Sequence, residues 1–244
     1  MKKKATPIRQ DRADQTRKNI LHAAIGEFSA HGLAGARTDA IAESAKVNKA
    51  LLYYYFKSKE RLYAAAFEEI ATAVAERTLA ALDPRYSAGE RLLRAALDHF
   101  DRILTKHEFQ SLLQQEMVRF RRGESGTIPL LVKKVYKPLL MKLEETVREG
   151  VRTGELCELD WLQVVYSMLG ANVFYFLSAP MMQLALPFNP FDVTALRARR
   201  RAVVQFLGNT LFVDRGHGAK LAKRVLADMP MPQFKKDQLW RKYV

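Results

Sequence analysis

The side chains with the clearest chemical potential are a lysine and three consecutive tyrosines within the stretch Lys49–Phe56, KALLYYYF. At 100° per residue along a helix, Leu52 and Phe56 point to one side and Tyr54 points roughly to the other. The other two tyrosines flank that outward direction, where their hydroxyls can donate to phosphates. Lys49, at the helix start, is long enough to reach guanine O6 and N7. Since three consecutive tyrosines cannot share one buried face, this segment predicts a helix that presents a face to nucleic acid.

A second short helix is needed to position the tyrosine helix. Thr38 is expected to cap a helix that has Ile41 and Ala45 on its apolar side, and Asn48 is expected to cap the tyrosine helix. Only four residues separate the two apolar faces, so the helices must cross steeply. This is the helix-turn-helix arrangement, whose second helix enters the major groove of DNA.

The neighbouring segments are predicted to support this pair of helices. A first helix is expected over residues 14–31, with Phe28 on its buried stripe and Gly32 at its end. Ser58 is placed to cap a long helix that continues to about residue 82. Lys59, at the start of that helix, adds its charge to the helix dipole in attracting a phosphate.

Residues 16–63 resemble the DNA-binding domain of the TetR/AcrR transcriptional regulators. The resemblance rests on Phe28, Gly32, Ile41, Ala42, Val47, the run Leu52–Phe56, Lys59 and Leu62. It implies that phosphates are held by Thr38, Tyr53, Tyr55 and Lys59. It also implies that bases are faced by Asn48, Lys49, Ala50 and Tyr54.

Three positions depart from the family pattern, namely Arg37, Lys46 and Leu51. Lys46 stands at the turn, where a left-handed conformation would cost a non-glycine residue about 1 kcal/mol. Leu51 could contact a thymine methyl group and so shift the operator sequence. The resemblance further implies a dimeric repressor that is released from a palindromic operator by a small hydrophobic or amphipathic effector.

The composition of the 244 residues is that of an ordinary globular protein, with 48% apolar residues. The net charge of +14 is concentrated at the ends: residues 1–57 hold 11 basic and 5 acidic residues, and residues 215–244 hold 8 and 2. A basic head suits phosphate contact.

The single Cys157 excludes an internal disulfide framework, and no apolar segment follows the initial lysines as in a secretory signal, so we expect a cytoplasmic protein.

The predicted organisation is all-α, with an N-terminal three-helix helix-turn-helix domain joined to a larger C-terminal helical domain for ligand binding and dimerisation. The ranges are a flexible basic arm (1–13), the helix-turn-helix domain (14–57), the larger domain (58–214) and a basic C-terminal extension (215–244). The arm, with Lys2, Lys3, Lys4, Arg9 and Arg12, either follows DNA or stays solvated. The extension's aromatics, Phe234, Trp240 and Tyr243, either stack on nucleic acid or, as we favour, pack on the body.

Helical periodicity continues beyond Pro84, with helices expected at about 87–106, 108–122, from the loop at Pro129 to 153 with a kink at Pro138, and 193–212. Glu116 falls within an apolar stripe, where a carboxylate is costly unless paired or protonated. It is expected either to form a salt bridge with a neighbouring Lys or Arg or to be exposed by a tilt of the helix. Alternatively, it anchors a ligand inside a cavity. The candidate ligand-binding residues are Phe100, Phe109, Leu113, Glu116, Phe120, Leu169 and Asn172.

From Trp161 to Phe191 the chain has no charged residue, which raises the question of a membrane span. Polar residues interrupt the stretch, so we interpret it as a helix buried on two sides, one against a two-fold partner and one against its own core. Small residues on one face would let a partner helix approach closely. The candidate dimer residues are Ser167, Gly170, Ala171, Phe174, Ser178, Leu196, Val203 and Leu207.

A search for catalytic motifs finds no nucleophile elbow, glycine-rich phosphate loop or zinc-binding HExxH pair. His99 and His107 are eight residues apart, too far for a shared metal without further ligands, and are expected to be exposed or capping histidines. We therefore expect no enzyme, cofactor or metal. Two alternatives to a ligand-responsive regulator stay open: a regulator without a small-molecule ligand, and a nonspecific nucleoid-type DNA binder.

Overall fold

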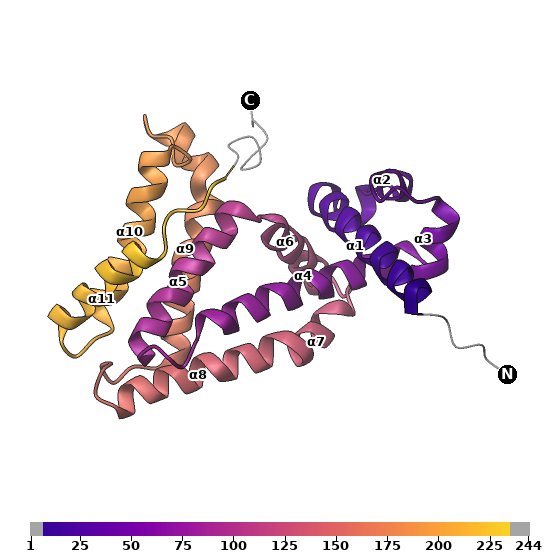
Figure 1. Ribbon diagram of the computed structural model, residues 1–244. Helices are drawn as coiled ribbons and strands as arrows, with labels where there is room; N and C mark the ends of the chain where they lie inside the picture. The colour runs from indigo at the N-terminus through magenta and orange to yellow at the C-terminus, as the bar shows by residue number, and fades with distance from the viewer. Residues whose placement is uncertain (1–6, 235–244) are drawn as a thin grey trace. The chain divides into compact units, whose positions relative to one another are not determined.

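The computed structural model describes residues 7–234, and within that range the regular structure is helical (Figure 1). In those residues the β pairing is confined to an isolated antiparallel bridge between Leu156 and Phe212. The all-α prediction, with a helix-turn-helix domain followed by a larger helical domain, is confirmed. The helices are α1 (Pro7–Gly35), α2 (Thr38–Ser44), α3 (Lys49–Phe56), α4 (Lys59–Ala81), α5 (Ala88–Thr105), α6 (Glu108–Arg121), α7 (Thr127–Leu131), the π-helical η1 (Val132–Tyr136), α8 (Lys137–Arg152), α9 (Trp161–Ala185), α10 (Val193–Thr210) and α11 (Arg215–Asp228).

The chain forms two compact units. Among the described residues, unit 1 holds 7–74 and 108–135, and unit 2 holds 75–107 and 136–234. Helices α6 and α7 thus belong to the same unit as the helix-turn-helix. The sequence-based boundaries at residues 58 and 215 were drawn between the helix-turn-helix domain, the larger domain and the basic extension. They do not coincide with the division into these two units.

In unit 1, α1 packs against α2 and α6, and α3 packs against α2. The buried residues of α1 recur at helical spacing, as Ile20, Ala24 and Phe28 do. The ring of Phe28 meets the buried ring of Tyr63 edge-on, with centroids 5.1 Å apart. Gly32 adopts φ 68°, which ends the regular part of α1 where the sequence predicted its stop.

The predicted start of this first helix and the predicted flexible arm both need correction. Helix α1 begins at Pro7, so Arg9 and Arg12 lie in a helix and not in a flexible arm. Proline is favoured at a helix start, because its fixed φ is helical and its missing N–H would have no partner there. Lys2, Lys3 and Lys4 lie outside the described residues.

The helix predicted to run to residue 153 consists of three consecutive segments, α7, η1 and α8. Pro138 stands in the first turn of α8, directly after the π-helical turn. Because proline has no N–H and its ring crowds the preceding turn, a regular helix cannot continue through it, and the wider π-helical turn accommodates the break. Gly154 follows α8 with φ 72° and ends it.

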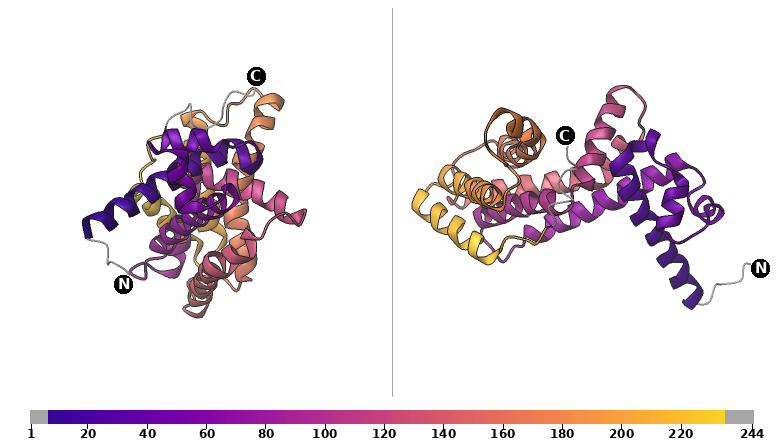
Figure 2. Two further views of the ribbon diagram at one scale, coloured as in Figure 1. Left: turned by 90° about the vertical axis from the view of Figure 1, so that its right-hand side faces the viewer. Right: turned by 90° about the horizontal axis from the view of Figure 1, so that it is seen from above.

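In unit 2, α5 is the central helix and contacts α8, α9, α10 and α11. Its N-cap is Ser87, whose Oγ accepts from the N–H of Glu90, so both predicted ends of this helix are confirmed. Helices α10 and α11 lie side by side in Figures 1 and 2. They approach so closely that a Cβ on Gly218 would clash with the carbonyl oxygen of Gly208.

Among the described residues, α9 is the helix whose length and composition would suffice to cross a membrane. One side of α9 packs against α5, α8 and α10, and the side chain of Asn172 is fully buried there. The other side exposes apolar residues such as Phe174. The sequence analysis expected this helix to pack against its own core on one side and against a two-fold partner on the other. The exposed apolar side of α9 is compatible with that expectation.

Candidate nucleic-acid interface

The turn between α2 and α3 is fixed by one strained residue and one cap. Lys46 has φ 56°, so this turn position is left-handed and carries the cost of about 1 kcal/mol that a non-glycine residue meets there. Asn48 caps α3 as predicted, since its Oδ1 accepts from the N–H of Leu51 at 2.7 Å. These two local features set the direction in which α3 leaves the turn.

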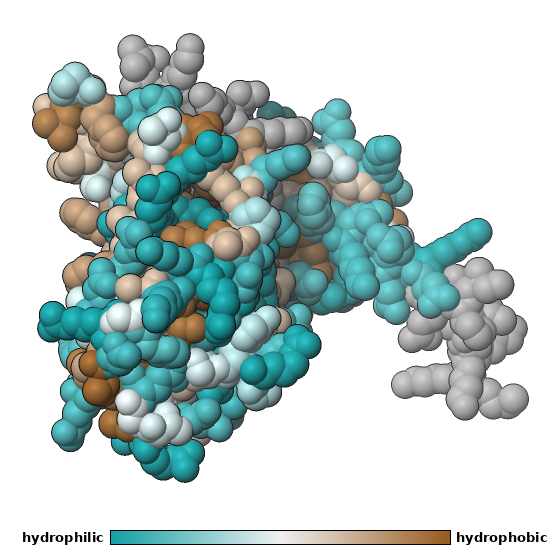
Figure 3. Space-filling view, turned by 60° about the vertical axis from the view of Figure 1, so that its left-hand side comes forward, coloured by the Kyte–Doolittle hydropathy of each residue, from teal (hydrophilic) through white to brown (hydrophobic). Residues whose placement is uncertain are grey.

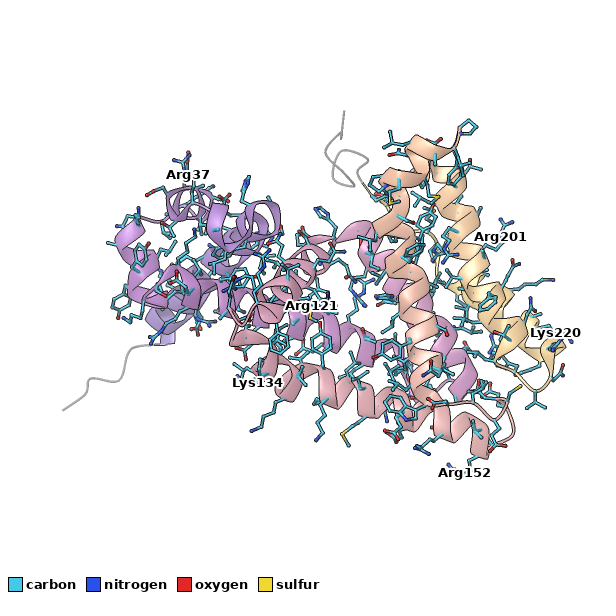
Figure 4. All side chains as sticks on the ribbon, turned by 180° about the vertical axis from the view of Figure 1, so that it is seen from behind. Arg37, Arg121, Lys134, Arg152, Arg201 and Lys220 are labelled. Atoms are coloured by element: carbon cyan, nitrogen blue, oxygen red, sulfur yellow. The ribbon has the colours of Figure 1, made fainter. Side chains whose placement is uncertain are left out.

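Thr38 does not cap α2, and this prediction was wrong. Arg37 occupies the N-cap position and makes no side-chain cap. Its N–H donates instead to Oε1 of Glu27 at 2.9 Å, which ties the start of α2 to α1. Thr38 is buried, and its Oγ1 accepts from the Tyr53 hydroxyl at 3.4 Å. Two of the four residues expected to hold phosphates therefore lie next to each other. The Arg37 side chain projects outward (Figure 4).

Helix α3 has the two faces that its spacing predicts. Leu52 and Phe56 are buried, whereas the side chain of Tyr54 is 69% exposed. Ala50 is also exposed, and Tyr55 is half-buried with its ring edge-on to that of Tyr54 at 5.5 Å. The outward face is small and apolar near its start and ends in a phenol, a surface able to follow base edges in a groove.

A lysine that the sequence reasoning missed adds a cation to this face. Lys57 has φ 66° at the end of α3, and its Nζ donates to the Tyr54 carbonyl at 2.8 Å. The same Nζ lies 5.2 Å from the centre of the Tyr54 ring, within cation–π range. Its position directly after the three tyrosines of α3 could have signalled this role.

The two predicted cationic contacts have partners within the protein. Lys49 Nζ forms an exposed ion pair with Asp39 at 3.0 Å, and Lys59 Nζ donates to the Ala34 carbonyl at 3.1 Å. Exposed ion pairs contribute little free energy, so Lys49 can exchange Asp39 for a nucleic-acid acceptor. Asp39 was not recognised in the sequence because the two residues are ten positions apart and on different helices.

The predicted ligand residues of unit 1 gather on α6, but Glu116 is already satisfied. Its carboxylate is fully buried, pairs with Arg119 at 2.8 Å and accepts a hydrogen bond from Ser125. This arrangement matches the salt-bridge alternative of the sequence analysis. Phe109 is buried against Phe67, with ring centroids 6.2 Å apart. Of the others, Leu113 is half-buried and Phe120 is exposed.

In unit 2, Asn172 lies in a buried polar pair on the core side of α9. Its Nδ2 donates to the Ala96 carbonyl at 2.9 Å and lies 3.3 Å from Nδ1 of His99. Its Oδ1 has no hydrogen-bond partner within the described residues. The other predicted ligand residues of this unit belong to two separate clusters. The Phe100 ring contacts that of Phe176, with centroids 5.1 Å apart, whereas Leu169 packs on the larger cluster that includes Leu92 and Val165.

His99 was expected to be exposed or capping, and this expectation was wrong. The ring is buried, and desolvation together with the nearby Arg102 guanidinium lowers the pKa of His99 to about 3. Helix periodicity placed it beside an apolar stripe, but the partner that makes its burial tolerable, Asn172, comes from α9.

Acid is therefore expected to destabilise the fold through His99. Since its folded pKa is lower than its unfolded value, the unfolded chain binds the extra proton below about pH 6.5, and the free energy of unfolding should fall by about 2 kcal/mol between pH 7.5 and pH 5. Urea unfolding at a series of pH values measures this loss. His99→Gln should remove it, whereas His22→Gln, at an exposed position, should retain it; equal acid dependence in both variants would contradict the assignment.

The predicted dimer residues divide into exposed and buried groups. Ser167, Gly170, Ala171 and Phe174 are exposed on α9 and remain candidates. The buried group is a correction, because these side chains already pack within their own chain: Ser178, Leu196, Val203 and Leu207. On α10 the large exposed apolar side chain is Phe206. The face of unit 2 turned forward in Figure 3 is largely hydrophilic, with apolar side chains exposed between polar ones.

Two family models match this sequence. Residues 20–66 match bacterial regulatory proteins of the tetR family, and residues 89–207 match a tetracyclin repressor-like C-terminal domain. The helix-turn-helix-type transcriptional repressor NicS of Pseudomonas putida is 44% identical over 70 residues, which are 29% of this chain and 33% of NicS. The match thus spans about a third of that repressor.

Solved structures extend the likeness over most of the chain. The crystal structure of a transcriptional regulator from Streptomyces coelicolor aligns with a TM-score of 0.55 and 27% identity, over 89% of this chain and 99% of that one. A gamma-butyrolactone receptor aligns with a TM-score of 0.62 over 89% of this chain and 100% of that one. Its identity is 20%, so this likeness concerns the fold alone.

Proposed function

Because this chain belongs to the tetR family of bacterial regulatory proteins, we propose that it is a dimeric repressor of transcription that binds a palindromic operator and leaves it when a small effector binds. The observation that carries this proposal is the outward face of α3, where Ala50 and the exposed Tyr54 face away from the core. In this role α3 lies in the major groove, with Asn48, Lys49, Ala50 and Tyr54 toward bases.

The flanking groups would hold the DNA backbone in register. Tyr53 and Thr38 form one cluster of hydroxyls. Tyr55 and Lys59 are proposed as further phosphate contacts, with Lys59 Nζ close to the Ala34 carbonyl at the end of α1. Phosphate contacts of this kind fix position but read no sequence. One eight-residue helix reads few bases, so a two-fold dimer that presents two copies of α3 to a palindrome supplies the remaining specificity.

Selection of sheared genomic DNA by the purified full-length protein tests this function. At about 0.15 M salt, nonspecific electrostatic binding is weakened and specific sites remain occupied. We expect recovery of a few fragments that share an inverted repeat. Uniform recovery of all fragments would contradict a sequence-specific repressor and support a nucleoid-type protein. Protein freed of bound small molecules by refolding from denaturant should be used, so that a retained effector does not mimic that result.

The dimer interface is proposed on the exposed sides of α9 and α10. Large apolar side chains stand exposed there: Tyr166 is 66%, Phe174 65% and Phe206 63% exposed. Exposed apolar side chains of this number on two neighbouring helices are typical of a surface covered by a partner. Gly170 and Ala171, between them, are small enough for a partner helix to come close.

A charge on this surface is expected to separate the subunits. Phe174→Asp should weaken dimerisation by roughly 100-fold or more, because a carboxylate would be buried in an apolar interface. Sedimentation velocity across a concentration series measures the change. Met141→Asp on α8, where the wild-type side chain is 59% exposed, is the matched control and should leave the dimer intact. A Phe174→Asp protein as dimeric as the control would place the interface elsewhere.

The effector is proposed to be a neutral or amphipathic small molecule that binds in the helical domain. Support comes from the unpaired Oδ1 of the buried Asn172, since an unsatisfied buried acceptor costs about 1–3 kcal/mol and a ligand donor would relieve that cost. One structural neighbour is named as a receptor for a small lactone. Release then follows from population shift, because an effector that prefers the unbound conformation weakens DNA binding by its differential affinity.

A further inference from the structure

The segment after α11 covers an apolar cluster of unit 2 without forming regular structure. It comprises Met229–Phe234 and appears in Figure 1 as the yellow trace that leaves α11. Met231 and Phe234 pack against this cluster, as the sequence analysis expected of Phe234. Trp240 and Tyr243, for which the same was expected, lie outside the described residues. The cluster, here called the α5/α9/α10 site, consists of Phe100, Ile103, Leu104, Phe176 and Leu196.

A single buried arginine holds the backbone of this segment. Arg200 on α10 is 5% exposed, and its Nη2 donates to the carbonyls of Met229 and Pro230, the latter at 3.3 Å. Its Nε and Nη2 also pair with the two carboxylate oxygens of Asp101 on α5, each at 2.8 Å. This bidentate pair fixes the plane of the guanidinium. The N–H groups of Arg200 that do not bind Asp101 therefore point in a set direction, toward the segment.

Met229 caps α11, with its N–H donating to the Val225 carbonyl, whereas residues 230–234 are held in the way that a bound peptide is held. Pro230 and Pro232 have no N–H to donate. Within residues 230–234, as far as the structure describes hydrogen bonds, the backbone is reached by Arg200 and by no helix or loop backbone. Side-chain anchors in an apolar site, together with captured main-chain carbonyls, are the elements of peptide recognition by a groove.

We propose that Met229–Phe234 is an exchangeable intramolecular ligand, and that the α5/α9/α10 site binds in its place an amphipathic small molecule with a neutral hydrogen-bond acceptor. The apolar body of that molecule replaces the side chains of Met231 and Phe234. Its acceptor replaces the carbonyls on Arg200.

The charges around Arg200 specify the acceptor more closely. Asp101 already neutralises the guanidinium, so a second carboxylate would meet the first one in a buried site and be repelled. A ketone, ester, amide or lactone carbonyl reproduces what the segment supplies. The site is therefore expected to prefer neutral carbonyl compounds with an apolar ring or chain.

Fluorescence titration of the full-length protein with Prodan, a neutral naphthalene ketone, tests the proposal. Met231→Ala combined with Phe234→Ala removes both anchors and should lower the apparent dissociation constant for Prodan by about 10-fold or more, because the internal competitor occupies the site less often. Gln233→Ala, at an exposed position of the same segment, should bind Prodan as the wild type does. A synthetic peptide with the sequence of residues 229–234 should displace Prodan from the double variant.

Equal Prodan affinity in the wild type and the double variant, or a peptide that does not compete, would overturn the proposal. If the double variant does not fold, as judged by circular dichroism, Phe234→Ala alone is measured. Since the Phe234 side chain is half-buried, this variant is expected to bind Prodan several-fold more tightly than the wild type, and no gain would overturn the proposal.

The role of Arg200 is tested without mutation. The parent dimethylaminonaphthalene, which lacks the ketone, should bind the double variant about 10-fold more weakly than Prodan does. Equal affinity of the double variant for Prodan and for the parent compound would show that Arg200 does not bind the ketone. None of these measurements involves DNA, so they stand apart from the proposed repressor function.

Discussion

Replacing Tyr54 by alanine is expected to weaken binding to the selected operator by about 10- to 100-fold, with little change in binding to nonspecific DNA. The reason is the position of Tyr54 on α3: its side chain is 69% exposed and points away from Leu52 and Phe56 in the core. A residue that contacts bases affects the preference between sequences, whereas nonspecific binding depends on phosphate contacts. Fluorescence anisotropy with operator and scrambled duplexes at the same salt concentration measures both.

Met141→Ala is the matched control, because Met141 is a large side chain of similar exposure, 59%, on α8 of unit 2 and lies outside the proposed dimer interface. It should leave both affinities unchanged. Since Tyr54 is largely exposed, its loss should not unfold α3, and circular dichroism of the variant should equal that of the wild type. If Tyr54→Ala weakened operator and scrambled DNA by the same factor, the assignment of the groove-facing side of α3 would be wrong.

Replacing Asp98 by alanine is expected to lower the free energy of unfolding by about 3–5 kcal/mol, a large fraction of the stability of an ordinary domain. Asp98 is 6% exposed on α5 and pairs with Arg102 at 2.7 Å and with Arg77 at 2.6 Å. Arg77 is half-exposed and can be hydrated after the change. Arg102 is 7% exposed and would keep a buried charge with no carboxylate beside it, which is the source of the cost.

Urea unfolding followed by circular dichroism measures this loss, and a double variant separates its cause from simple loss of packing. Asp98→Leu combined with Arg102→Met replaces the pair by apolar side chains of similar size and should recover most of the lost stability. Asp83→Ala, which removes the carboxylate of an exposed ion pair with Arg85, should cost little. If the double variant were as unstable as Asp98→Ala, the unpaired charge of Arg102 would not be the cause of the lost stability.

The features that sequence alone predicted are those set by local chemistry. The cap at Asn48 and the buried pair Leu52 and Phe56 depend on residues within one or two turns of each other. Periodicity and capping residues specify such features directly. The helix-turn-helix, including the side of α3 that faces outward, could therefore be predicted from these residues alone.

The features that sequence did not predict depend on residues distant in the chain. Thr38 meets Tyr53, 15 positions away, and so does not serve as a cap. His99 is buried because Asn172 reaches it from α9. Leu196 illustrates a further limit: an apolar stripe on α10 shows that one side is covered, but not whether the chain itself or a second subunit covers it.

The ion pair between Asp101 and Arg200 joins residues 99 positions apart, and no periodicity indicates it. Each residue alone looks like an ordinary charge on an amphipathic helix. Only the packing of α5 against α10 brings them together and buries them. The same Arg200 guanidinium binds the carbonyls of Met229 and Pro230, so the role of the segment Met229–Phe234 could be inferred only from the structure.

Methylation interference on the selected operator tests most directly that α3 reads the major groove. DNA treated lightly with dimethyl sulfate carries methyl groups at guanine N7, on the major-groove edge that Lys49 is expected to reach. We expect that binding excludes duplexes methylated at guanines in two symmetric clusters, about one helical turn or a multiple of it apart, and that Lys49→Ala weakens this exclusion. Binding that tolerates a methyl group at every guanine N7 of the operator would contradict a reading helix in the major groove.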